Sequence, residues 1–284
     1  MTVTIPSKYP LEGHRMAEVD LRHGDCIDVL RTLPAGSVDS VVTSPPYAMQ
    51  RKSTYGGIPE KDYPGWTVAW MQEVWRVLKD DGSVIINIRP HIRNGQISDY
   101  VLRTRMALRE AGWCELEELI WNKKGGAPLG SIHRPRRTWE SLLWFGKHGR
   151  SYSAPKAAGQ GSECVGRVHG RTGAHIHDGQ TDLRTGIARV PDVVEMSTRL
   201  NTDSNGLNDH PAPFPWQLAE WCGKLITPPG GTILDPFTGS SSTGVAAIRN
   251  GWNFIGIDQS PEYIEMSNRR LNAELAKAAE RENK

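Results

Sequence analysis

The 284-residue sequence lacks the features of membrane, secreted and disulfide-rich proteins. No apolar run approaches the ~20 residues that a membrane-spanning helix needs. The first residues, MTVTIPSKYP, have neither the basic start nor the apolar stretch of a secretory signal. The four cysteines stand far apart without a CxxC pair, which indicates free thiols in a reducing compartment. We therefore expect a cytoplasmic protein that makes no contact with a membrane.

Two common phosphate-binding patterns are missing as well. The turn GSSSTG at residues 239–244 has no lysine, so it is not the GK[ST] loop of an NTPase. The dinucleotide pattern GxGxxG is also unmet, because Ser241 stands where the second glycine would be. Asp235, just before this turn, would repel a pyrophosphate and suits a ligand with a cationic ammonium.

The net charge of +2 hides one strongly basic segment. Residues 122–190 hold twelve Lys and Arg but only four acids, so the rest of the chain is mildly acidic. This asymmetry is typical of a surface that meets a polyanion, although a solvated basic loop would have the same composition. The 38% hydrophobic and 23% charged content is that of a soluble globular protein.

Strand-like and helix-like runs alternate on both sides of the basic segment. VDSVVT at 38–43 and TILDPF at 232–237 read as buried strands, whereas Tyr100–Glu110 and Pro215–Ile226 read as helices. The alternation predicts a doubly wound, mostly parallel α/β sheet with helices on both faces. From Gly149 to Asn208 the periodicity disappears, and we expect irregular structure there.

The stretch ILDPFTGSSSTGVAAIRNGWNFIGID forms the strongest local unit, a strand, a tight turn, a helix and a second strand. In doubly wound sheets, ligands bind beyond the carboxyl ends of the strands. Asp258 follows Gly239 by 19 residues, a spacing at which an acid accepts hydrogen bonds from ribose hydroxyls. S-adenosylmethionine, with a ribose, an ammonium and no phosphate, fits this pattern. The alternative is an ordinary crossover without a ligand.

Residues 43–47, TSPPY, leave the strand VDSVVT through two consecutive prolines. A proline ends a strand because it has no backbone N–H for the ladder, but one turn residue would be enough for that. Two rigid residues between Ser44 and Tyr47 suggest a backbone held in one shape for a ligand. The alternative is a strand-terminating turn with an incidental tyrosine.

Together these two segments resemble a known family. DPFTGSSSTG is similar to the cofactor motif, and TSPPY to the catalytic motif, of S-adenosylmethionine-dependent DNA amino-methyltransferases. The catalytic motif comes first here, as in the beta group of that family, and the resemblance extends from about Asp20 to Arg270. It implies a seven-stranded methyltransferase sheet with an irregular, basic target-recognition insert. Residues 1–124 would form its catalytic half, 125–208 its last strands (about 138–147) plus the insert, and 209–284 its cofactor half.

The resemblance implies a catalytic role for Ser44, Pro45, Pro46 and Tyr47. The Pro45 carbonyl and the Ser44 oxygen would hold both hydrogens of a base amino group, so that its nitrogen can turn toward the methyl group. The Tyr47 ring would stack on a base flipped out of double-stranded DNA. Transfer is then direct and in line, and it needs positioning rather than a metal.

The resemblance also implies a cofactor site assembled from five parts of the chain. Its members are Asp25, Cys26, Thr43, Pro213, Phe214, Asp235, Pro236, Phe237, Gly239, Ser240, Ser241, Asp258 and Gln259.

The target base follows from what surrounds the cysteines and from Ser44. None of the four cysteines follows a proline, so methylation at cytosine C5 is not expected. In the resembling enzymes serine at position 44 is usual for cytosine N4 and aspartate for adenine N6. We therefore expect cytosine N4, with adenine N6 as the alternative. An RNA or protein amide methyltransferase, or a non-catalytic DNA-binding protein on this scaffold, is a further alternative.

Double-stranded DNA is the expected partner, and basic residues in two segments are its candidate contacts. These are Arg51 and Lys52 in the loop after TSPPY, and Arg134, Arg136 and Arg137 in HRPRR. The histidines of RVHGRTGAHIHDG could ligate a metal, but they lack a cysteine partner, and we expect DNA contacts instead. The resemblance leaves open a homodimer and a cognate restriction endonuclease as further partners.

Overall fold

The structure is a computed structural model that describes residues 2–5, 17–50, 56–124, 133–149, 151–153, 190–197 and 214–282. Within these ranges, no helix has the length and apolar character needed to cross a membrane.

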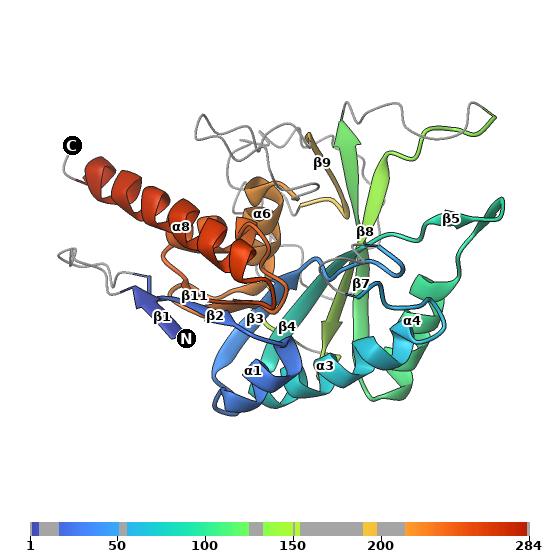
Figure 1. Cartoon of the computed structure of the whole chain (residues 1–284), viewed down its shortest axis with the longest axis horizontal. Coiled ribbons are helices and arrows are strands. Elements are labelled where there is room, and N and C mark those ends of the chain that lie inside the picture. The colour runs from blue at the N-terminus through green and yellow to red at the C-terminus, as the bar shows by residue number, and fades with distance from the viewer. Residues whose placement is uncertain are drawn as a thin grey trace, which may run out of the picture.

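One large sheet runs through the molecule in the order β1-β2-β11-β10-β3-β4-β8-β7-β9 (Figure 1). Its strands are β1 (Thr2–Ile5), β2 (Val19–His23), β3 (Val38–Thr43), β4 (Leu78–Ile88), β7 (Cys114–Lys124), β8 (Trp139–Gly146), β9 (Val193–Ser197), β10 (Thr232–Asp235) and β11 (Asn253–Asp258). A small hairpin, β5 (Ile92–Arg93) and β6 (Gln96–Ile97), stands apart from it.

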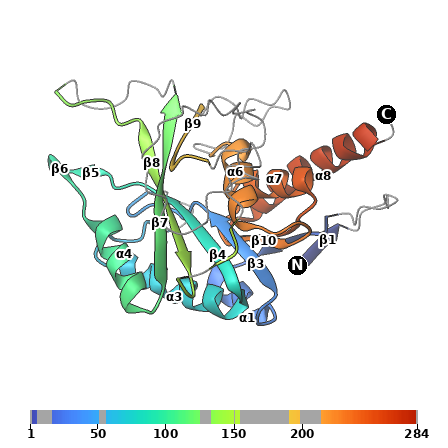
Figure 2. The same cartoon turned by 180° about the vertical axis from the view of Figure 1, so that it is seen from behind.

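Helices cover both faces of this sheet (Figures 1 and 2). One face carries α1 (Cys26–Thr32), α3 (Tyr63–Val77) and α4 (Tyr100–Glu110), and the other carries α6 (Trp216–Ile226), α7 (Ser242–Asn250) and α8 (Pro261–Glu282). Each face buries its own apolar core, because the strands are sandwiched between two helical layers. The predicted doubly wound α/β architecture is therefore confirmed.

The predicted seven strands form the centre of the sheet, and β1 and β9 extend it at its two edges. The strand β9 corrects the expectation of wholly irregular structure between Gly149 and Asn208. It pairs in parallel with β7 from Ile120↔Val193 to Lys124↔Ser197. Five residues are too few to show a hydrophobic period, so this strand depends on the neighbouring edge rather than on a local pattern.

The topology gathers the ends of several strands at one edge of the sheet. β3 lies parallel to β10, with Leu234 opposite Val41, so Thr43 and Asp235 end side by side. β8 is antiparallel and lies between β4 and β7, with Ser141 opposite Ile88. The start of β8 therefore lies beside the ends of β3, β4, β7 and β10. We call this side of the sheet, where these strands end, the catalytic edge; it is distinct from the outermost strands β1 and β9.

Candidate active site

Asp235, the last residue of β10, is almost completely buried at the catalytic edge. Its Oδ1 accepts hydrogen bonds from Thr43 Oγ1 at 2.7 Å and from the Phe237 N–H at 3.1 Å. Its Oδ2 accepts one from Thr243 Oγ1 at 2.9 Å. Burial raises the pKa of Asp235 to about 6, although these hydrogen bonds work against the shift. Within the described residues no Lys or Arg pairs with it, so this carboxylate has no counter-ion.

The turn that follows is held closely against Asp258 at the end of β11. The Gly239 N–H donates to Asp258 Oδ2 at 2.9 Å, and the Ser260 N–H donates to Oδ1, also at 2.9 Å. Ser241 adopts a left-handed conformation with φ of 61°, which glycine would adopt without strain. Ser240 is buried, and its carbonyl accepts from Arg270 Nη1 at 2.8 Å. The turn therefore keeps its shape with serine in place of glycine.

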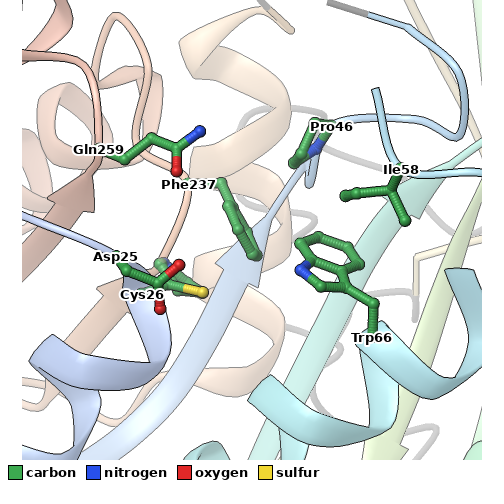
Figure 3. Close-up of a pocket in the computed structure, with 8 residues that line it drawn as sticks. Asp25, Cys26, Pro46, Ile58, Trp66, Phe237 and Gln259 are labelled. Atoms are coloured by element: carbon green, nitrogen blue, oxygen red, sulfur yellow. The ribbon is translucent and has the colours of Figure 1, made fainter. Parts of the chain in front are cut away.

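A pocket opens between the two motifs, with about 490 Å³ of empty space, part of it open to solvent (Figure 3). It is lined by Asp25, Cys26, Pro46, Ile58, Trp66, Pro236, Phe237 and Gln259. Predicted cofactor residues and one predicted catalytic residue thus share one cavity. Asp25 caps α1 by accepting from the Ile27 N–H at 2.9 Å. Phe214 lies near the turn, where its carbonyl accepts from Ser242 Oγ at 2.8 Å.

Trp66 and Ile58 were missed by the sequence prediction. The Trp66 ring lies 5.4 Å from that of Phe237, so two aromatic rings wall one side of the pocket (Figure 3). Trp66 belongs to α3, a helix with three tryptophans, of which Trp70 is fully buried. Helical spacing alone assigns such residues to the core. Only its position in the helix could have identified Trp66 as a pocket residue: it lies one turn from the start of α3 and therefore near the catalytic edge.

A polar cluster lies on the other side of the SPPY segment. Tyr47 donates its hydroxyl proton to Glu140 Oε2 at 2.8 Å, and Asn87 Nδ2 donates to the same oxygen at 2.9 Å. Lys123 forms an ion pair with Glu140 Oε1. Burial and the Glu140 charge raise the pKa of Tyr47, whereas a hydrogen bond with the Ser44 side chain lowers it. We refer to Tyr47, Glu140, Asn87 and Lys123 as the Glu140 cluster. The sequence prediction included only its tyrosine.

The three arginines of HRPRR precede β8 and lie in different environments. Arg134 and Arg136 are exposed, and Arg134 donates to the Gly95 carbonyl in the β5–β6 hairpin. Arg137 is half-buried, and Arg89 Nη2 donates to its carbonyl at 3.3 Å. Burial lowers the pKa of Arg137, and the nearby charge of Arg89 lowers it further. Neither Arg89 nor Arg137 has an ion pair with a carboxylate in the part of the chain that the structure describes.

Several predicted residues lie outside the described residues: Arg51, Lys52, Pro213, Cys164, His169, His175, His177 and Asp178. Cys26 and Cys222 are buried, which raises the pKa of both thiols and makes them poor nucleophiles. The ranges that are described contain no group of three or more His, Cys, Asp or Glu that could hold a metal ion.

Comparison with known proteins agrees with this geometry. A family model described as DNA methylase matches residues 38–269, which include both motifs and the strands that carry them. The chain belongs to this DNA methylase family. Methylases of the family use S-adenosyl-L-methionine as the methyl donor, so the resemblance and the cofactor expected from the sequence are confirmed at the level of the family.

The methylase is similar to characterised relatives along most of its length. It is 28% identical to the Type II methyltransferase M.Cfr9I of Citrobacter freundii over 303 residues, which cover 92% of each chain. It is 26% identical to the Type II methyltransferase M.PvuII of Proteus hauseri over 274 residues, which cover 86% of this chain and 81% of the relative.

Solved structures show the same fold. The PvuII DNA methyltransferase, described as cytosine-N4-specific, superimposes with a TM-score of 0.69 at 23% identity and 93% coverage of each chain. TTHA0409 from Thermus thermophilus, solved in complex with S-adenosyl-L-methionine, superimposes with a TM-score of 0.59 at 23% identity. That match covers 90% of this chain and 95% of TTHA0409.

Proposed function

We propose that this DNA methylase transfers a methyl group from S-adenosylmethionine to the N4 amino group of cytosine in double-stranded DNA. The observation that carries the proposal is the junction between the two motifs. Thr43, directly before SPPY, donates to Asp235, the first residue of DPFTG, and Pro46 and Phe237 line one pocket. A group bound on the cofactor side therefore lies next to the segment proposed to hold the base.

The residues of the cofactor side fit S-adenosylmethionine. Asp258, held by two backbone N–H groups, would accept hydrogen bonds from the ribose hydroxyls. The carboxylate of Asp235, which has no counter-ion among the described residues, would attract the ammonium of the methionine end. Phe237 and Trp66 offer apolar walls for the adenine. We include Pro213, which lies outside the described residues, and Phe214 at the methionine end.

The catalytic side then needs only to hold the base amine. The amino lone pair of cytosine is delocalised into the ring, so the amine is a poor nucleophile. Ser44 Oγ and the Pro45 carbonyl would accept its two hydrogens and stabilise the positive charge that develops on nitrogen. Pro46 keeps this backbone rigid, and the Tyr47 ring would stack on the flipped base. The bound cofactor supplies an activated methyl group, so direct in-line transfer follows from positioning.

Two observations favour cytosine N4 over adenine N6. Ser44 occupies the position where the resembling enzymes carry serine for cytosine, and the PvuII structure with the same fold is described as cytosine-N4-specific. Adenine N6 is the second candidate, because the family model covers both N6 and N4 methylases, as its name states.

The DNA would be held mainly through its phosphates. Arg89 and Arg137 place two half-buried guanidinium groups without carboxylate partners among the described residues at the catalytic edge, and guanidinium suits a phosphate. Arg134 and Arg136 extend this basic surface, and we include Arg51 and Lys52. The insert between residues 125 and 208 would read the target sequence. Because its relatives are Type II methyltransferases, we propose a cognate restriction endonuclease as a partner in the cytoplasm.

The first test is to identify the modified nucleoside. The protein is incubated with methyl-labelled S-adenosylmethionine and duplex DNA, and the DNA is digested to nucleosides for mass spectrometry. We expect label in N4-methylcytosine only, and none when Ser44→Ala and Tyr47→Ala are combined. Label in N6-methyladenine would show that adenine, rather than cytosine, is the target base. Label in 5-methylcytosine would refute methylation of an amino group, and unlabelled DNA after incubation with the wild type would refute the proposed function. Methylome sequencing of cells that express the protein identifies the recognised sequence.

A further inference from the structure

The β5–β6 hairpin stands apart from the large sheet, on the side of the catalytic edge. β4 ends at this edge with Ile88 and α4 begins at Tyr100, so the hairpin between them lies at the same edge. It projects from the body of the molecule beside the start of α4 (Figures 1 and 2). All residues of its sequence IRNGQI, at 92–97, are exposed. The hairpin is therefore placed to meet a partner rather than to complete the core.

The tip of the hairpin is a tight two-residue turn. Arg93 pairs with Gln96, so Asn94 and Gly95 form the loop between the two strands. Asn94 has a φ of 49° and Gly95 a φ of 74°, the left-handed conformations that a type I′ turn needs. The side-chain amides of Asn94 and Gln96 form no hydrogen bond with any other described residue. The turn thus presents two amide groups that are available to a partner.

Glu60 fixes the base of the hairpin. Its Oε1 accepts from His91 Nε2 at 2.5 Å, and its Oε2 accepts from Ser98 Oγ at 2.9 Å. The Ser98 N–H donates to the His91 carbonyl at 2.9 Å and closes the same end. At the tip, Arg134 donates to the Gly95 carbonyl. An isolated two-stranded hairpin is only marginally stable in water, so these contacts hold its shape before a partner arrives.

The surface of the hairpin combines positive charge with apolar side chains. The Arg93 side chain is 58% exposed, and its contact with Glu60 is long, at 3.5 Å. Arg89, just before the hairpin, has no carboxylate partner among the described residues. Ile92 and Ile97 are 38% and 64% exposed, on the face opposite Arg93, because side chains alternate along a strand. Phosphates line the rims of a DNA groove and thymine methyl groups lie inside it, so this surface matches a groove.

We propose that the β5–β6 hairpin enters the major groove of the DNA and that Asn94 and Gln96 contact base edges there. This inference rests on the proposed function, because it takes double-stranded DNA as the substrate, and it adds a second recognition element to the insert. The major groove is about 12 Å wide and admits a two-stranded ribbon, and an Asn or Gln amide can form two hydrogen bonds with adenine. Arg93 would contact a phosphate, and the two isoleucines would contact thymine methyl groups.

The hairpin is close enough to the SPPY segment to contact the same DNA site. Asn87, near the end of β4, donates to the Tyr47 oxygen at 3.4 Å. Asn94 follows Asn87 by seven residues, which span at most about 25 Å. Base pairs are spaced about 3.4 Å apart along the duplex, so the bases contacted by the hairpin would lie within about seven base pairs of the target base.

The test compares the wild type with the double variant Asn94→Gly, Gln96→Ala. Glycine adopts the conformation of Asn94 without strain, and Gln96 is exposed, so the hairpin should keep its fold. Methylome sequencing of cells expressing the wild type gives the recognised sequence. Fluorescence anisotropy then measures affinity for a duplex with this sequence and for one without it. We expect affinity for the recognised duplex alone to fall about tenfold, with an unchanged salt dependence. The methylome of the variant should show a relaxed base preference near the target.

Three further variants separate base contacts from phosphate contacts and from folding. Gln96→Ala alone, which leaves the turn intact, should lose affinity for the recognised duplex about threefold. Arg93→Gln should lower the slope of log affinity against log salt by about 1 for both duplexes. Arg109→Gln is the matched control, because Arg109 is 67% exposed and lies 3.7 Å from Glu115, at the far end of α4. Its affinity and slope should equal those of the wild type.

Each result decides the inference. A loss of affinity for the recognised duplex alone, with a relaxed base preference, supports it. An unchanged affinity and methylome overturn it and leave a hairpin that only solvent surrounds. Equal losses for both duplexes with a smaller salt slope also overturn it, because the amides would then contact only phosphates. If the wild type itself transfers no methyl group to DNA, the proposed function fails and the role of the hairpin fails with it. Activity of the wild type therefore shows which of the two claims has been refuted.

Discussion

Two buried carboxylates lie on the two sides of β3, and they differ in how their charge is balanced. Glu140, on the side of β4 and β8, is paired with Lys123 and accepts from Tyr47 and Asn87. Asp235, on the side of β10, accepts from two hydroxyls and one backbone N–H, with no cation among the described residues. Burial raises the pKa of Asp235 to about 6 as a result.

The difference indicates that the charge of Glu140 stabilises the fold, whereas the charge of Asp235 is available to a ligand. A buried carboxylate that is already paired with a lysine is neutralised, and it can hold neighbouring hydroxyl groups in one orientation. A buried carboxylate without a cation is unfavourable until a ligand supplies one. Asp235 is therefore suited to a cationic ligand, whereas Glu140 holds the side chains of Tyr47 and Asn87 in place. The following predictions test this contrast, beginning with the largest expected effect.

Removing Lys123, the cation that pairs with Glu140, should destabilise the protein. In Lys123→Met, Glu140 keeps its buried charge and its hydrogen bonds but loses its cation, and we expect the free energy of unfolding to fall by about 2 kcal/mol. Urea denaturation of the purified protein measures this change. Adding Glu140→Gln should recover most of the loss, because no unpaired charge remains. A Lys123→Met variant as stable as the wild type would show that Glu140 does not depend on this lysine.

Protonating Asp235, the carboxylate without a cation among the described residues, should weaken cofactor binding. A cationic ligand favours the ionised form of Asp235, so affinity should be constant above a pH of about 6 and fall as the pH drops below that value. One unit below the pKa, about a tenth of the carboxylate is ionised, and the dissociation constant of S-adenosylmethionine should rise about tenfold. Isothermal titration calorimetry at several pH values measures it.

The matched control is Asp235→Asn, which cannot ionise. It should bind the cofactor more weakly at neutral pH and show no change in affinity over the same pH range. An equally strong pH dependence in this variant would assign the effect to another group and would remove the contrast with Glu140.

Arg89 and Arg137, at the catalytic edge, are cations that have no carboxylate partner among the described residues. Replacing Arg89 or Arg137 with Gln should weaken DNA binding about fivefold and lower the slope of log affinity against log salt by about 1. Fluorescence anisotropy with labelled duplex at several salt concentrations measures both. Arg103→Gln is the control, because Arg103 is exposed on α4 and already paired with Asp99 at 2.7 Å. An unchanged slope for Arg89→Gln would exclude it from the DNA interface.

The features that the sequence predicted correctly depend on short segments of the chain. The helix Tyr100–Glu110 was predicted with its exact bounds. Ser260 caps α8 by accepting a hydrogen bond from the Tyr263 N–H at 3.3 Å, which is a local contact of the same kind. Two hydrogen bonds of the turn after Asp235 are also local: the Phe237 N–H donates to Asp235, two residues away, and the Gly239 N–H donates to Asp258, 19 residues away. Capping residues, glycine turns and apolar periods are properties of short stretches, and one sequence is enough to recognise them.

The resemblance to the family was likewise readable from the residues, because the two motifs and their order are written in the chain. The roles assigned to Ser44 and Pro45 remain predictions for the experiments above. The strand β9 and the pocket wall at Trp66 were not readable, since one is a five-residue edge strand and the other looks like ordinary helix packing.

The sequence alone was thus sufficient for the α/β architecture, the two motifs and the cofactor they imply, because each depends on residues close together in the chain. The partners of Tyr47 required the folded chain. Glu140 is 93 residues from Tyr47 and 53 from Asn87, and no local pattern relates them. They meet because β8 enters the sheet antiparallel between β4 and β7, so that its first residues, rather than its last, lie at the edge where the other strands end.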